Sequence, residues 1–120
     1  MSELEAYEGR LADLATLQAG WNSYHSAAIK PEAVEAARAL VKRLAGHPRI
    51  DVAHLFPMGN GGIQLESFDS REWEIECHAE DNYGIWFDDP ETDRDDLSLD
   101  DVVAMLNELL DIKQGMDTTS

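Results

Sequence analysis

The chain has 120 residues, of which 43% are hydrophobic, and it carries a formal net charge of -16. This length suits one compact domain that buries roughly two-thirds of the surface of its unfolded chain. The acid excess argues against direct nucleic-acid binding, because each phosphate contact needs a lysine or arginine to displace a counterion. No apolar run approaches the ~20 residues of a membrane span, and the acidic N-terminus is unlike a signal peptide. We therefore expect a cytoplasmic protein that does not contact membranes.

The charge is concentrated in one part of the chain. Residues 1–50 hold six acidic and six basic residues, whereas residues 51–120 hold 19 acidic and three basic residues. This asymmetry is typical of a protein that binds a basic partner. It would also arise if the acidity served only solubility, or reflected an acid-shifted or halophilic proteome. The sequence leaves both interpretations open.

Two helices are expected in the first part of the chain. The first covers residues 3–17, starts with a capping box and ends before Gly20. The second begins at Pro31, whose fixed φ suits the first helical position, and ends near Gly46. In both segments apolar residues recur at intervals of three and four, which predicts one buried stripe on each helix.

A four-stranded antiparallel sheet is expected next, because apolar and polar residues alternate in several runs separated by short polar breaks. The expected strands are residues 52–56, 63–66, 72–79 and 83–88. The apolar phase places four residues in the core: Leu65, Trp73, Ile75 and Ile85. Cys77 shares this phase, and we interpret it as a buried small hydrophobic residue, not a reactive thiol.

A third helix is expected from Ser98 to about Lys113, with Gly115 beyond its end. The Asp-rich segment before it is expected as a loop, and residues 116–120 as a frayed tail. The predicted fold class is therefore α+β, with two N-terminal helices, a four-stranded antiparallel β-meander and a C-terminal helix. These elements form a single domain of residues 1–115.

Sites for metals, cofactors or catalysis have little support in the sequence. The four histidines show no zinc spacing, and the glycines between residues 59 and 62 lack the Gly-Lys-Ser/Thr of a phosphate loop. A calcium loop would need Gly at the position of Arg94. Its other positions would be filled by Asp89, Glu91, Asp93, Asp95 and Asp100. We expect no metal, no cofactor and no enzymatic activity.

The polar phase of the sheet and the Asp-rich segment form the candidate binding surface. Alternate residues on a strand lie ~6.6 Å apart, close to the phosphate separation along a nucleic-acid strand. Trp86 shares the polar phase, so it is either covered by a helix or exposed as an anchor among carboxylates. The predicted partner-binding residues are Glu66, Glu72, Glu74, Glu76, Trp86, Asp88, Asp89, Asp93, Asp95 and Asp96.

The loop between the first two helices is rich in aromatic residues, including Trp21 and Tyr24. One interpretation is an aromatic plug between the helices and the sheet, since a large aromatic side chain stabilises most where it is buried. The other interpretation is a surface that stacks on a ligand or a partner.

Two segments of the chain carry a resemblance: Gly20-Trp21-Asn22-Ser23-Tyr24 with Ile29-Lys30-Pro31, and Gly61-Gly62-Ile63-Gln64-Leu65-Glu66. Together they resemble a group of short bacterial and phage-borne proteins of uncharacterised function. Those proteins have a Gly-Trp-Asp/Asn-x-Tyr loop before a Pro-initiated helix and a Gly-Gly-Ile/Val-x-Leu-Glu strand. The chain departs from them at Lys30, where Ser or Thr is common, and at Ser67, where an aromatic residue is common.

The resemblance implies no particular activity, but it implies the biology of mobile elements. In that setting small acidic proteins look like phage anti-defence inhibitors, including anti-CRISPR proteins, which occlude basic nucleic-acid-binding channels. Three hypotheses follow. The first is an acidic inhibitor that docks on a basic nucleic-acid-binding protein. The second is an antitoxin or immunity-type partner that binds through the Trp21/Tyr24 loop, and the third is a small enzyme with an unrecognised site.

Overall fold

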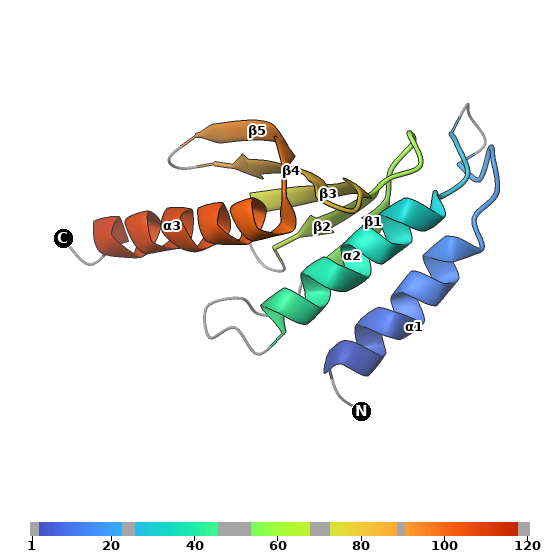
Figure 1. The fold of residues 1–120 in the computed structure, drawn as a ribbon, viewed down its shortest axis with the longest axis horizontal. Coiled ribbons are helices and arrows are strands. Elements are labelled where there is room, and N and C mark those ends of the chain that lie inside the picture. Colours follow the sequence, from blue (N-terminus) through green and yellow to red (C-terminus); the bar gives the residue numbers. More distant parts are fainter. Residues whose placement is uncertain (1–2, 23–25, 46–53, 68–72, 89–90, 118–120) are drawn as a thin grey trace.

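The computed structural model describes residues 3–22, 26–45, 54–67, 73–88 and 91–117. Within these residues the strands form one antiparallel sheet in chain order, and helices pack against it (Figure 1). The elements are α1 (Glu3–Ala15), α2 (Pro31–Leu44), β1 (His54–Pro57), β2 (Ile63–Glu66), β3 (Trp73–Ala79), β4 (Asn82–Phe87), β5 (Thr92–Leu97) and α3 (Leu99–Asp117).

The α+β class is confirmed, but the prediction of four strands was wrong, because the sheet has a fifth strand, β5. Its sequence, TDRDDL, has no alternation of apolar and polar residues, and only Leu97 of the strand is buried. Backbone pairing with β4 holds the strand at the edge of the sheet. An edge strand rich in charged residues is a common device against unwanted strand pairing.

The helices differ from the expected ones mainly at their ends. Pro31 begins α2 as predicted. The side chain of Ser98 accepts a hydrogen bond from the N–H of Asp101 at 3.1 Å, which is the expected cap of α3. That helix continues to Asp117, so the predicted end near Lys113 was wrong. Gly115 therefore lies inside the helix. A glycine lowers helix stability but does not by itself end a helix. Residues 118–120 lie outside the described part of the chain.

A hydrophobic core fills the space between the helices and one face of the sheet. The predicted core residues Leu65, Trp73, Ile75 and Ile85 are all at most 3% exposed. From the helices, the core receives Leu11 and Leu14 of α1, Leu40 and Val41 of α2, and Val102 and Leu106 of α3. The helices therefore cover this face, and the sheet directs its alternate residues to the opposite face.

The loop before α2 is joined to the turn between β1 and β2. The N–H of Ala27 donates to the carbonyl oxygen of Gly59 at 2.8 Å, and the N–H of Lys30 donates to that of Gly61 at 2.9 Å. The indole N–H of Trp21 donates to the carbonyl oxygen of Ala27 at 3.0 Å. The two segments that carry the resemblance therefore lie against each other, with Trp21 bracing the loop. Tyr24 lies outside the described residues.

Candidate binding surface

Strand register aligns the outward side chains in rows that run across the sheet. Glu66 of β2 is opposite Glu74 of β3, Glu74 is opposite Trp86 of β4, and Trp86 is opposite Asp93 of β5. His54 of β1 completes this row beside Glu66. Side chains directly opposite each other have Cβ atoms roughly 5 Å apart. The row therefore places Trp86 between the carboxylates of two neighbouring strands.

A second row lies beside the first and contains Gln64, Glu76 and Gly84. A bulge in β5 sets two residues, Asp95 and Asp96, against Gly84. A β-carbon added to Gly84 would lie 2.8 Å from Oδ1 of Asp95, so this carboxylate occupies the space that the glycine leaves open. We call the resulting surface the acidic face; it consists of Glu66, Glu74, Glu76, Trp86, Asp93 and Asp95.

The structure brings six of the ten predicted partner-binding residues together in this acidic face. Asp88 follows β4 and is exposed, and Asp96 is exposed in the bulge with a left-handed φ of 57°. Glu72 and Asp89 lie outside the described residues. Trp86 is partly exposed and lies in the sheet phase opposite that of the core residues Ile85 and Phe87.

Carboxylates on this face repel one another. Glu66 and Glu74 are directly opposite on adjacent strands, an arrangement that destabilises a sheet by roughly 0.2–1 kcal/mol. The side-chain amide of Gln64 offsets part of this repulsion because it donates to Glu66 at 2.7 Å. His78 Nε2 lies 3.5 Å from Glu76 Oε1. Each of these contacts involves only one carboxylate, so the face as a whole keeps its negative charge.

Several of the basic residues lie in the helical layer. Arg38 of α2 donates to the carboxylate of Glu8 at 2.8 Å and also to Glu35, and these hydrogen bonds raise the pKa of its guanidinium. Arg43 forms an ion pair of 2.7 Å with Asp100, and Arg10 donates to the carbonyl oxygen of Leu55 at 3.1 Å. Acid–base pairs thus join α2 to α1 and to α3, although the helices as a group hold more acidic than basic residues.

Sequence reasoning missed two aromatic side chains at the border of the acidic face. His54 and Phe56 have ring centroids 5.8 Å apart, and Phe56 is 40% exposed. The alternation of these two residues with the apolar Leu55 could have been recognised in the sequence. The residues that they face on the neighbouring strand depend on the pairing of β1 with β2. The roles of Gln64 and Gly84 were missed for the same reason.

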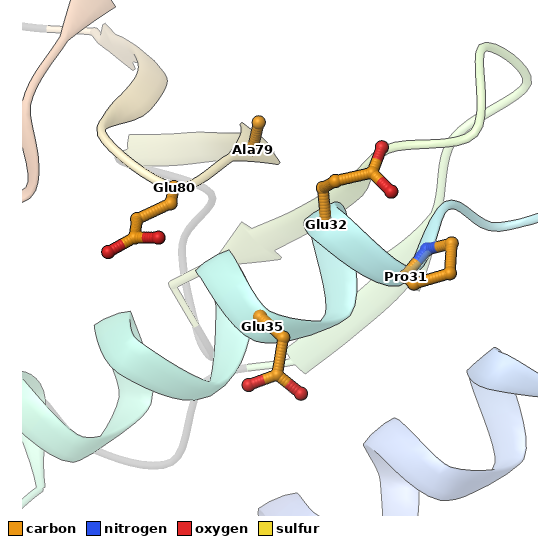
Figure 2. A pocket seen from close by; sticks show the side chains of 5 residues that line it. All are labelled: Pro31, Glu32, Glu35, Ala79 and Glu80. Atoms are coloured by element: carbon orange, nitrogen blue, oxygen red, sulfur yellow. The ribbon is translucent and has the colours of Figure 1, made fainter.

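A shallow pocket of about 420 Å³ lies elsewhere, where the first turns of α2 meet the turn between β3 and β4. Pro31, Glu32, Glu35, Ala79 and Glu80 line it. Figure 2 shows the three carboxylates pointing in different directions instead of converging on one point. The pocket therefore has no evident centre for a bound cation.

The structure bears on the other candidate sites. Among the described residues, no three His, Cys, Asp or Glu side chains are grouped to hold a metal ion. Asp93 and Asp95 lie in β5, so this segment is not a calcium-binding loop. Cys77 is fully buried, which raises the pKa of its thiol, whereas His78 contacts Glu76 on the other face. In the described part of the chain, no helix combines the length and apolarity of a membrane span.

Comparisons of the chain with protein-family models, curated protein sequences and solved structures found no match. The function has to be inferred from the surface itself.

Proposed function

We propose that this protein is a non-catalytic inhibitor or binding protein, acting in the cytoplasm, whose acidic face docks on a basic nucleic-acid-binding surface of another protein. The observation that supports this function best is the cross-strand register. It places Glu66 and Glu74 about 5 Å apart across neighbouring strands and Glu74 and Glu76 ~6.6 Å apart along one strand. The two other carboxylates, Asp93 and Asp95, lie on β5, on the other side of Trp86. A nucleic-acid site presents lysines and arginines at comparable intervals, because it follows a row of phosphates.

The distribution of charge supports the same function. Two basic residues of α2 are paired with carboxylates of the other helices, Arg38 with Glu8 of α1 and Arg43 with Asp100 of α3. The helices keep an acid excess of their own, and the acidic face adds five carboxylates with no lysine or arginine among its residues. A surface of one sign attracts a partner of opposite sign over a distance of about one Debye length and accelerates association.

The repulsion between Glu66 and Glu74 gives a second argument. Like charges at directly opposite positions reduce sheet stability, and a cation supplied by a partner would relieve their repulsion. Local conflicts of this kind tend to occur at functional sites. The resemblance to phage-borne proteins agrees with an inhibitor of a nucleic-acid-binding defence protein.

The decisive experiment compares two triple variants. In the test variant, Glu66→Gln, Glu74→Gln and Asp93→Asn neutralise one row of the acidic face. In the control, Asp13→Asn, Glu32→Gln and Glu108→Gln neutralise three exposed carboxylates of the helices. Both variants raise the formal net charge by three, so bulk charge is matched.

Each protein is immobilised and used to capture partners from bacterial lysate, which are eluted with a nucleic-acid competitor and identified. Binding of the purified partner is then measured at 0.05 and 0.5 M NaCl. We expect the test variant to reduce the low-salt association rate about tenfold or more, and the control to change it less than threefold. Equal losses in both variants, or capture that nucleic acid does not displace, would contradict the proposal.

The alternative in which the Trp21/Tyr24 loop binds a protein partner has less support. The indole N–H of Trp21 is already bonded to Ala27, and Ala27 is in turn bonded to Gly59. Such contacts fit a bracing role within the chain better than a role at an interface.

A further inference from the structure

We infer that Trp86 and its two opposite carboxylates, Glu74 and Asp93, form a subsite for one arginine side chain of the partner. This inference rests on the proposed function and deepens it, because it names the side chain that the acidic face selects. Its starting observation is the row in which Trp86 of β4 stands between Glu74 of β3 and Asp93 of β5.

Trp86 is unusual in its position on the sheet. Leu65, Ile75, Ile85 and Phe87 all point into the core, whereas Trp86 lies on the outward face, where it is only partly buried. Tryptophan is enriched among the residues that dominate protein interfaces, and its ring offers the best aromatic surface for a cation. A tryptophan surrounded by carboxylates is therefore suited to a cationic side chain more than to an apolar one.

The two flanking carboxylates decide between arginine and lysine. A guanidinium is planar, stacks on an aromatic ring and presents donors at its edge in a fork that matches carboxylates. Glu74 and Asp93 lie on opposite sides of Trp86, each about 5 Å away at the level of the Cβ atoms. A guanidinium over the ring could therefore donate to a carboxylate at either edge, while an ammonium, as a point charge, lacks this match.

Gly84 allows a third carboxylate to lie beside the ring. It precedes Trp86 by two residues on the same face, between Glu76 and the bulge of β5, and its lack of a side chain leaves space for a neighbouring group. The carboxylate of Asp95 reaches into this space, as the 2.8 Å approach to the position of a β-carbon at Gly84 shows. The arginine would thus meet a third carboxylate next to the ring.

The test uses two probes of equal charge, a hexa-arginine and a hexa-lysine peptide. Binding is followed by NMR through the indole N–H signals of the three tryptophans, with that of Trp86 assigned by its loss in Trp86→Phe. At 0.5 M NaCl, where bulk attraction is screened, we expect hexa-arginine to bind about tenfold more tightly than hexa-lysine. The Trp86 signal should shift, while those of Trp21 and the buried Trp73 stay in place.

Variants separate this subsite from general charge attraction. Trp86→Leu should abolish the preference for arginine at 0.5 M NaCl, because it weakens the binding of hexa-arginine about tenfold and that of hexa-lysine much less. Phe56→Leu, which changes another exposed aromatic residue on the same side of the sheet, is the matched control and should keep the preference. Thermal melting of each variant establishes that it is folded.

The outcomes distinguish the two proposals. If both peptides bind equally and Trp86→Leu has no effect, the arginine subsite is wrong while docking through the acidic face still stands. If neutralising Glu66, Glu74 and Asp93 weakens peptide binding no more than the helical control triple does, the proposed function itself is wrong.

Discussion

The N–H of Lys30 donates a hydrogen bond to the carbonyl oxygen of Gly61 at 2.9 Å, across 31 residues of sequence. This bond joins the residue before α2 to the turn before β2. Gly61 has a φ of 91°, in the region that favours glycine, and a β-carbon there would lie 2.9 Å from the carbonyl oxygen of Ala28. The contact between loop and turn therefore requires a glycine at this position.

Gly61→Ala is expected to lower the free energy of unfolding by about 2 kcal/mol or more, since it combines a strained φ with a backbone clash. Urea denaturation measures the change. Gly59→Ala is the control, because a β-carbon there meets nothing within 4 Å, and stability should stay the same or rise by about 0.5 kcal/mol. Equal effects of the two substitutions would show that the turn does not depend on the loop.

Trp21→Phe removes the indole N–H that donates a hydrogen bond to the carbonyl oxygen of Ala27, and it keeps an aromatic ring in place. The loss of this hydrogen bond is expected to cost about 1 kcal/mol of stability, measured by urea denaturation. Binding to the captured partner should not change. A tenfold weaker binding of this variant with normal stability would instead favour the loop as the partner-binding surface.

Stability should fall at alkaline pH because of two buried acids. Burial raises the pKa of Tyr83, whose hydroxyl donates to the carbonyl oxygen of Ala36 at 2.8 Å, and it raises the pKa of the Cys77 thiol. Ordinary values are about 10 and 8.5, so above these pH values the unfolded chain releases protons that the native state retains. The native state then binds more protons than the unfolded state, and stability declines as pH rises.

Tyr83→Phe tests this directly. At pH 7 the variant is expected to lose about 1 kcal/mol with the hydrogen bond to Ala36. Above about pH 10 its stability should decline less steeply than that of the wild type, by up to roughly 1.4 kcal/mol per pH unit. Denaturation curves at pH 7, 9, 10 and 11 measure both effects. Parallel declines in the two proteins would mean that Tyr83 ionises as easily in the native state as in the unfolded chain.

Glu66→Gln is expected to raise stability while it weakens partner binding. It removes the repulsion with Glu74 and retains a polar group beside Gln64, so stability is expected to rise by roughly 0.2–1 kcal/mol at low salt. Partner binding should weaken in the same variant. Melting temperature and binding are measured on one preparation at 0.05 and 0.5 M NaCl, and the gain in stability should shrink at the higher salt.

Gly9→Ala provides a stabilised background for these variants. Gly9 lies in α1, is exposed, and would meet nothing within 4 Å if it carried a β-carbon. Replacing a glycine inside a helix by alanine is expected to raise stability by about 0.5–1 kcal/mol, and urea denaturation checks the gain. Lower stability in this variant would contradict an exposed helical position for Gly9.

The sequence by itself determined which residues of each long strand point inward. On β3 the apolar residues Trp73, Ile75 and Cys77 alternate with Glu74 and Glu76, and the structure keeps that phase. A strand has a period of two residues, so a local pattern is enough to sort its side chains between core and solvent. In the same way, Pro31 and Ser98 marked helix starts, because the chemistry of a cap is local.

Only the tertiary structure decided where β5 lies and what its carboxylates face. Backbone hydrogen bonds to β4 hold this strand at the edge of the sheet, where only one of its side chains is buried. Backbone hydrogen bonds require no particular side chains, so the sequence of β5 shows no alternation of apolar and polar residues. The order Glu66, Glu74, Trp86, Asp93 across four strands likewise follows from the pairing registers. Register depends on turns, bulges and the packing of the whole sheet, so no single segment encodes the neighbours that Trp86 meets.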